Sequence, residues 1–311
     1  MEKNNIKLRI FKDSDFSQVL SFLNKNLEFD TVSSGILKEK IYEDPYFDIN
    51  NIHIAEQNNK ILGFVQAVLR DINKQRYGYI KLFAVDKAYR RCGIGTKLYN
   101  QVFKYFKKEK VDIVRIYDVP LNYFMPGIDP RYTPALCFFE KLGFKKFDET
   151  CNLKVDLNNK NWDVSDKITE LKEAGIQITR AEDKDKQKLS EFVADEWKLW
   201  VHEVETALKS KPKAVFIARY KGKIKAFSAY NGNNIGTAWF GPMGTHPDLR
   251  GKGIGSILLY LCLQDMKEHG FKYSTIPWVG PISFYSHYAD AFVERVFWRY
   301  ELKIKNTGIY E

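Results

Sequence analysis

Residues 90–96 read RRCGIGT, and residues 250–256 read RGKGIGS. Both stretches contain the pattern Arg-x-x-Gly-x-Gly, and Gly253 follows Gly93 by 160 residues. A segment of that length is the size of one compact domain. The repeat therefore predicts a duplicated fold in which each copy carries the same glycine turn.

The composition agrees with two domains of ordinary size. The chain has 311 residues, of which 44% are hydrophobic, so each half can bury its own core. No apolar run approaches the ~20 residues that cross a bilayer, and the stretch MEKNNIK lacks the apolar core of a signal peptide. We therefore expect a cytoplasmic protein that does not enter a membrane. The four cysteines form no Cys-x-x-Cys pair, which predicts neither a disulfide framework nor a metal site.

The formal net charge is +10, but the lysines are spread along the whole chain. No signature of an RNA- or DNA-binding module accompanies them, so we expect no nucleic-acid partner. A positive field of this kind attracts a polyanionic small molecule, such as a phosphate-bearing cofactor.

Periodicity predicts the same order of elements in both halves. In the first half, strands at 6–11, 51–57, 59–70 and 77–86 precede the glycine turn, with a helix beginning near residue 15. A helix from residue 94, a strand at 111–119, a helix at 135–144 and a strand at 151–157 follow. The second half repeats this order, with Gly270 as the C-terminal stop of its post-turn helix. The expected domains are 1–157 and 165–311, joined by a linker at 158–164.

The glycine turns have the local chemistry of an anion site. A helix that starts at Gly-x-Gly directs unpaired backbone N–H groups outward at the positive end of its dipole. Side chains at Gly93, Gly95, Gly253 or Gly255 would hinder the approach of phosphate oxygens. Neither copy has the GxxxxGK[ST] pattern of a Walker loop, and GKGIGS narrowly misses the GxGxxG dinucleotide pattern.

These residues resemble the GNAT superfamily of acetyl-CoA-dependent N-acetyltransferases. The family pattern Gln/Arg-x-x-Gly-x-Gly/Ala follows its fourth strand, and an aromatic pair precedes its last helix and strand. The aromatic pairs here lie in ALCFFEKLGF and ISFYSHYADAF. The resemblance covers nearly the whole chain and implies an α/β fold of two tandem mixed domains. In each, a central, mostly antiparallel sheet is splayed between strands four and five and is flanked by helices.

The resemblance implies that the turn amides hold the pyrophosphate of coenzyme A, while strand four contributes amides to the pantetheine and thioester. The residues expected to bind acetyl-CoA are Phe83, Val85, Arg90, Arg91, Cys92, Gly93, Ile94, Gly95 and Thr96 in the first copy, and Met243, Thr245, Arg250, Gly251, Lys252, Gly253, Ile254, Gly255 and Ser256 in the second. Independently, Pro242 lacks a backbone donor and is expected at a bulge or an edge of its strand.

A difference between the copies predicts which one performs catalysis. In the family, a tyrosine after strand five often protonates the departing thiolate; Tyr285 has that place in the second copy, and Phe139 in the first. We expect the C-terminal domain to be catalytic with Tyr285 as general acid, and the N-terminal domain to bind acetyl-CoA without efficient turnover. The alternatives are that Tyr285 only packs beside the cofactor, and that the N-terminal domain acetylates slowly through water. Candidates for a base or water relay are His202, Glu203, His287 and Asp290.

The expected acceptor is a small primary amine, attacked directly in a ternary complex. Trp197 and Trp200 are candidates to contact it, since aromatic faces suit a sugar ring, although tryptophans at this spacing also pack in cores. The second half resembles tandem acetyltransferases of the glucosamine and glucosaminide type. Alternatives are a mycothiol-precursor-like or aminoglycoside acceptor, a protein amine, and a non-catalytic acetyl-CoA sensor. The loop 118–134 occurs only in the first copy, where it would cover a cleft, touch the acceptor or act as a structural plug.

Overall fold

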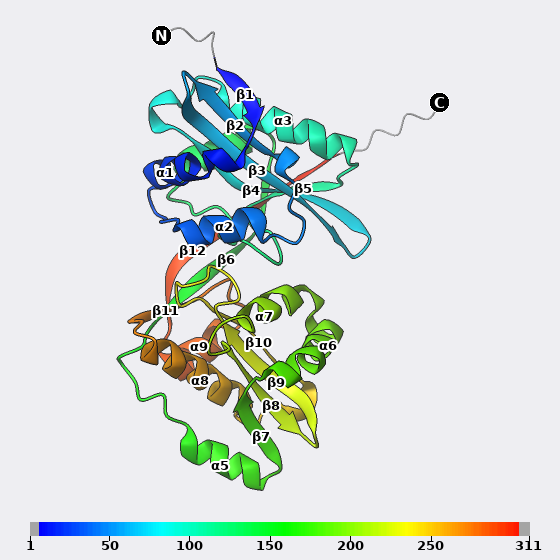
Figure 1. The fold of residues 1–311 in the computed structure, drawn as a ribbon, viewed down its shortest axis with the longest axis vertical. Coiled ribbons are helices and arrows are strands. Elements are labelled where there is room, and N and C mark those ends of the chain that lie inside the picture. The colour runs from blue at the N-terminus through cyan, green and yellow to red at the C-terminus, as the bar shows by residue number, and fades with distance from the viewer. Residues whose placement is uncertain (1–5, 305–311) are drawn as a thin grey trace. The chain divides into compact units, whose positions relative to one another are not determined.

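A computed structural model describes residues 6–304 and divides the chain into two compact units (Figure 1). Unit 1 contains the residues up to Glu149 together with those from Phe297 onward, and unit 2 is Thr150–Val296. This division differs from the expected boundaries, because strands β6 (Lys145–Asp156) and β12 (Phe292–Lys303) each run from one unit into the other. The last strand, expected in the second domain, pairs through Glu301–Lys303 with a strand of unit 1.

Unit 1 is a sheet covered by helices on both faces (Figure 1). Helices α1 (Phe16–Asn26) and α2 (Ser34–Tyr42) cover one face, and α3 (Ile94–Lys108) covers the other. Helix α4 (Thr133–Lys141) packs beside α3, since a Cβ on Gly95 would lie 3.2 Å from Phe138. Glycines in the strands let α3 approach closely, because a Cβ atom at Gly78 would lie 2.7 Å from the ring of Phe106. The strands, in sheet order, are β1 (Lys7–Ile10), β2 (Ile52–Gln57), β3 (Lys60–Ile72), β4 (Gln75–Val85), β5 (Ile113–Ile116) and the end of β12. The short 3-10 turns are η2 (Asp13–Asp15), η3 (Ile49–Asn51) and η4 (Lys87–Tyr89).

Unit 2 repeats this plan with a four-stranded antiparallel sheet, and β11 (Tyr273–Ile276) pairs antiparallel with β6 at the end of the strand order that contains β12. Helices α8 and α9 lie on one side of the sheet, and α6 and α7 on the other (Figure 1). The order of the four-stranded sheet is β10 (Phe240–Thr245), β9 (Lys223–Tyr230), β8 (Val215–Tyr220) and β7 (Ile176–Arg180). The helices are α5 (Ser165–Glu173), α6 (Lys186–Trp197), α7 (Val201–Ala207), α8 (Ile254–Glu268) and α9 (Ile282–Ala289), with 3-10 turns η5 (Asp183–Asp185), η6 (Lys198–Trp200) and η7 (Pro247–Leu249).

The central strands separate within one residue of the same place in both units. β4 and β5 pair in parallel as far as Ile80 and Ile116, and the amide of Tyr117 donates to the carbonyl of Ile80 at 3.0 Å. β4 then continues to Val85. In unit 2 the corresponding contact is a parallel bridge between Trp239 and Thr275, after which β10 continues to Thr245. The predicted fold class, including the splay, is therefore confirmed.

The loop 118–134 is a packed part of unit 1. Ile128 is fully buried and exchanges backbone hydrogen bonds with Trp298, at 2.9 and 2.8 Å. Gly127 permits this approach, since its Cβ would lie 2.8 Å from the carbonyl oxygen of Trp298. Arg299 pairs with the buried carboxylate of Asp118 at 3.0 Å, where burial raises the pKa of Asp118 to about 7 despite the guanidinium. Of the expected roles for this loop, the packing within unit 1 agrees with that of a plug.

No helix among residues 6–304 combines the length and the apolar character that a membrane span requires.

Candidate functional site

Each unit has a glycine turn between its splayed strand and the next helix. Gly93 and Gly253 begin α3 and α8 with positive φ angles of 81° and 72°. A Cβ atom at either position would meet nothing within 4 Å, so the backbone conformation, and not close packing, requires glycine there. The first amides of both helices have no acceptor within the helix. Each turn can therefore hold an anion with backbone donors and the helix dipole.

Cationic side chains lie around both turns, and one of them also braces its turn. Arg91 and Lys252 are exposed, and Arg90 is half-buried. The Nε atom of Arg250 donates to the carbonyl oxygen of Thr245 at 3.1 Å, which links the turn to the end of β10. Two other predicted loop residues, Ile94 and Ile254, are buried at the first position of their helices. The rest are exposed or half-buried: Cys92, Gly95, Thr96, Gly251, Gly255 and Ser256.

An apolar side chain of the splayed strand packs against the aromatic pair beside each turn. In unit 1, Phe83 stacks on Phe138 with ring centroids 5.5 Å apart, and a Cβ on Gly95 would lie 3.2 Å from Phe138. In unit 2, Met243 and Phe284 both lie 3.6 Å from the corresponding position on Gly255. The two units thus place the same three positions together. Val85 and Thr245, two residues further along their strands, are also half-buried.

Tyr285 lies beside the splayed end of β10. Its side chain is 7% exposed, and its ring centroid is 6.0 Å from that of Phe240 and 5.1 Å from that of Phe284. Burial raises the pKa of Tyr285, which keeps the phenol protonated at neutral pH. Among residues 6–304 no group hydrogen-bonds to its hydroxyl, which can therefore donate its proton to a bound group. Phe139, at the matching position of unit 1, is fully buried.

The predicted base candidates lie in two places. His287 is exposed and follows Tyr285 by two positions on α9, which turns it roughly 200° around the helix axis. Asp290 ends that helix and pairs with Lys160 at 2.9 Å. Neither therefore shares the buried face of Tyr285. On α7, Glu203 is 8% exposed and His202 is half-buried. The catalytic roles of these four residues stay predictions.

Trp197 and Trp200 form an aromatic wall on β10. Their rings are stacked, with centroids 5.6 Å apart and an interplanar angle of 14°. The ring of Trp197 lies directly over Gly244, whose Cβ would be 2.6 Å from it. Because neighbouring strand residues point to opposite faces, and Met243 points toward α8, the wall lies on the face of β10 away from the glycine turn. The sequence alone did not identify Gly244 as the residue that admits this wall.

Pro242 lies at a β-bulge, as the sequence predicts. β10 is the edge strand of its sheet, and its register against β9 shifts between Phe240 and Met243. The bulge interrupts the ladder beside Tyr285 and the aromatic wall, where an unpaired strand amide can bond to a carbonyl oxygen.

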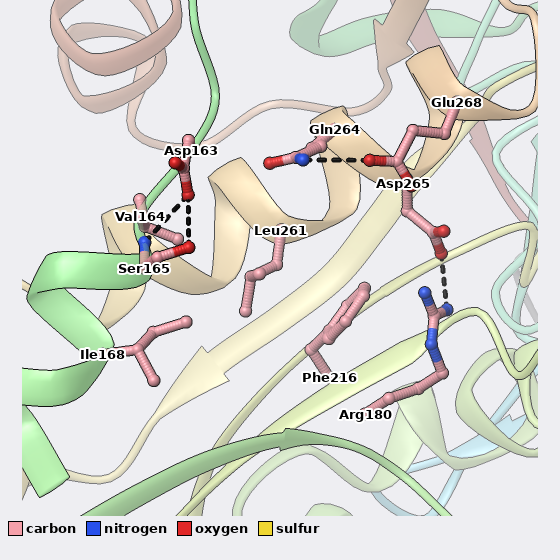
Figure 2. A pocket seen from close by; sticks show the side chains of 10 residues that line it. All are labelled: Asp163, Val164, Ser165, Ile168, Arg180, Phe216, Leu261, Gln264, Asp265 and Glu268. Carbon is pink, nitrogen blue, oxygen red and sulfur yellow. Dashed lines mark hydrogen bonds and ion pairs between the residues drawn. The ribbon is translucent and has the colours of Figure 1, made fainter.

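A pocket of unit 2 lies elsewhere and contains none of the predicted site residues (Figure 2). It has a volume of about 180 Å³ and lies between α5 and the C-terminal half of α8. Arg180 points toward Asp265 there and donates to it at 2.5 Å, and the hydroxyl of Tyr230 donates to the same carboxylate at 2.8 Å. These bonds join α8 to β7 and β9, so the polar groups beside this pocket support the helix that carries the glycine turn.

Comparisons with known proteins identify a family in each half. An acetyltransferase (GNAT) domain model matches residues 48–146, and an acetyltransferase (GNAT) family model matches residues 177–294. No curated protein sequence matches the chain.

Solved structures share the fold at low identity. A GCN5-related glucosamine N-acetyltransferase region in a fungal multi-domain GH3 beta-N-acetylglucosaminidase has a TM-score of 0.81 at 18% identity, covering 96% of this chain; this chain spans only 38% of that one. A GCN5-related N-acetyltransferase from Sphaerobacter thermophilus has a TM-score of 0.70 at 15% identity, covering 97% and 96% of the two chains. A tandem GNAT protein from the clavulanic acid biosynthesis pathway has a TM-score of 0.70 at 14% identity, covering 96% and 98%.

The contact between Gly244 and Trp197 predicts a specific mutational effect. Gly244→Ala places a methyl group where the indole ring lies, so the ring must move off β10. We expect a shifted tryptophan emission spectrum and a melting temperature lowered by the equivalent of about 1–3 kcal/mol. Gly280→Ala is the matched control, because its Cβ meets nothing within 4 Å. Identical spectra for the two variants would contradict the placement of Trp197.

Proposed function

Since the chain belongs to the GNAT acetyltransferase family, with one GNAT domain in each half, we propose that it transfers the acetyl group of acetyl-CoA to the primary amine of an amino sugar, such as glucosamine or a glucosaminide, in its C-terminal unit. The observation that carries the choice of unit is the buried phenol of Tyr285 beside the splayed β10, where unit 1 has Phe139. Unit 1 binds acetyl-CoA without efficient turnover.

The residues of both turns fit the coenzyme. The open space over Gly93 and Gly253 and the free helix-start amides suit a diphosphate, and Arg91 and Lys252 add positive charge at the surface. Phe83 and Val85 in unit 1, and Met243 and Thr245 in unit 2, would flank the pantetheine arm. When bound, acetyl-CoA supplies an acetyl group activated as a thioester.

The residues of unit 2 account for the remaining requirements of the reaction. A strand amide at the β10 bulge is suited to hydrogen-bond the carbonyl oxygen on which charge develops. Tyr285 is suited to donate its proton to the departing sulfur. An acceptor with an amine pKa near ~8 is about one-tenth neutral at pH 7, so it needs little help from a base.

Two observations support the amino sugar. The rings of Trp197 and Trp200, which stack on each other and pack against the core of unit 2, lie on the side of β10 away from the glycine turn, where an acceptor can approach from the opposite face. Flat aromatic surfaces suit the apolar face of a sugar ring. The fungal structure with the same two-unit fold is described as a glucosamine N-acetyltransferase region.

The acceptor is tested with a panel of amines, with thiol release as the readout. The panel contains glucosamine, chitosan oligomers, aminoglycosides, cysteine-linked amino sugars, polyamines and peptides. We expect the highest kcat/KM with glucosamine or its oligomers. Turnover of peptides together with a flat response to every amino sugar would instead support a protein acceptor.

The assignment of one coenzyme site to each unit predicts separable effects of two matched substitutions. Gly93→Asp and Gly253→Asp each add a carboxylate to one turn, at a positive φ that Asp tolerates better than most residues. Calorimetric titration of the full chain with acetyl-CoA should give two sites, and one in each variant. Only Gly253→Asp should abolish transfer. Loss of transfer in Gly93→Asp alone would place catalysis in unit 1.

The proposed acid role predicts a defect in turnover and not in binding. Tyr285→Phe removes the proton donor but keeps the ring that packs on Phe240 and Phe284. We expect kcat to fall about 10²-fold with an unchanged Kd for acetyl-CoA, measured by steady-state kinetics and titration. Tyr288→Phe, on the same helix, is the control. Undiminished turnover in Tyr285→Phe would leave Tyr285 only a packing role.

A further inference from the structure

A fully buried lysine lies at the splay of unit 1. Lys81 is the first residue of β4 beyond the last parallel pair, Ile80 with Ile116. It is also the extra residue of a bulge, because Ile80 pairs with Ala67 and Leu82 pairs with Gln66. Its side chain is 0% exposed and points toward α2, on the face of the sheet away from the glycine turn.

The ammonium of Lys81 has a complete set of acceptors. Its Nζ atom donates to the carbonyl oxygen of Lys40 at 2.8 Å, to Oδ2 of Asp44 at 2.6 Å and to Oδ1 of Asn122 at 2.9 Å. An ammonium has three donors, so all of them are used. A carboxylate, an amide oxygen and a backbone carbonyl are the groups with which a protein binds a primary amine.

The acceptors are themselves held in place. Oδ2 of Asp44 also accepts from Arg70 at 2.7 Å, and both side chains are 2% exposed or less. Burial alone would raise the pKa of Asp44, but the charges of Lys81 and Arg70 hold it below its usual value, so the carboxylate stays charged. Burial lowers the pKa of Lys81 to about 7, and the charge of Asp44 opposes that shift. Arg70 is fixed in turn by the carbonyl oxygen of Pro120 at 3.1 Å.

Unit 2 is different at the same position. Gly241 follows Lys81 by the same 160 residues that separate the two glycine turns, and it also lies in the bulge of its strand. A Cβ atom at Gly241 would meet nothing within 4 Å. Unit 2 therefore has no side chain at the position that Lys81 holds in unit 1.

Two acceptors in the cluster come from the segment that unit 2 lacks. Asn122 and Pro120 lie in the loop 118–134, which is packed into the core of unit 1. The loop 118–134, Lys81 and Phe139, which has no hydroxyl, thus occur together in unit 1. All three differ from unit 2 around the same end of the splayed strand.

We propose that Lys81 occupies the amine-acceptor position of unit 1, so that this unit holds acetyl-CoA beside a permanently filled acceptor site and takes no external amine. This inference depends on the proposed function for the location of the acceptor, but the amine site itself can be tested without acetyl-CoA.

The test uses the full chain and an amine that replaces the missing part of the side chain. Lys81→Ala removes three carbons and the nitrogen, which is the heavy-atom content of n-propylamine. We expect Lys81→Ala to melt at a lower temperature than wild type, and n-propylamine to raise its melting temperature more than that of wild type. Lys81→Met is the matched control, because its side chain fills the space of the stem and should leave no room for the amine. Trimethylpropylammonium, which has no N–H donor, should have no selective effect on any variant.

A second readout tests whether this site is an acceptor position. In a Gly253→Asp background, which removes transfer by unit 2, Lys81→Ala given acetyl-CoA and n-propylamine should form N-propylacetamide above the level of Lys81→Met. In that reaction the amine nitrogen bonds to the acetyl carbon as the C–S bond breaks, and the sulfur leaves as CoA thiol with a proton lost by the amine. Stabilisation without product would show an amine site that is not an acceptor position and would overturn the proposal.

The remaining outcomes are also decisive. No selective stabilisation of Lys81→Ala by n-propylamine would overturn the amine site. If Lys81→Ala does not fold alone, refolding is compared with and without n-propylamine. Recovery only with the amine supports the site, and no recovery in either condition overturns it. If unit 1 does not bind acetyl-CoA, calorimetric titration of the wild-type chain gives one acetyl-CoA site and not two. That result is distinct from the melting-temperature result that would overturn the amine site.

Discussion

The separation of two parallel strands is the constraint on which the rest of this structure depends. Parallel pairing stops at Ile80 in unit 1 and at Trp239 in unit 2, while β4 and β10 continue beyond these residues. The strand ends then have backbone donors and acceptors with no neighbour on one side, and such groups are costly to bury without partners. A bulge in each strand lies at this point, and a glycine turn follows a few residues later. The gap between the parallel strands, the unpaired amides of the continuing strand and the glycine turn all follow from the point where the parallel pairing stops.

The two units have the same fold but different side chains around the splayed strand. In unit 1, Phe139, Lys81 and the loop 118–134 fill the space around the end of β4 with packed and charge-paired side chains. In unit 2, the hydroxyl of Tyr285 has no hydrogen-bond partner among residues 6–304, and Gly241 has no side chain at the position of Lys81. A buried ion pair contributes little net stability once desolvation is counted, and the proposed role of the cluster around Asp44 is to hold Lys81 in one position. A duplicated fold allows one copy to become closed while the other keeps the features of a reactive site.

The position of the aromatic wall depends on the absence of a side chain at Gly244. Trp197 lies against β10 only because residue 244 is glycine, and the neighbouring Met243 keeps its side chain on the opposite face beside the glycine turn. One strand therefore separates the side with the glycine turn from the side with the two tryptophans.

Local patterns in the sequence determined the two glycine turns, the order of strands and helices, the stop at Gly270 and the bulge at Pro242, because each depends on backbone conformations that a few adjacent residues impose. The fold class followed from the repeat of those patterns. Tertiary structure alone decided that β12 completes the sheet of unit 1, because the hydrogen-bond partner of a strand is not encoded in the strand itself. Tertiary structure also decided the hydrogen-bond partners of Lys81, which in the sequence is only a lysine within an apolar strand. Its acceptors lie 37 residues earlier at Asp44 and 41 residues on either side, at Lys40 and Asn122, and only folding brings those three together.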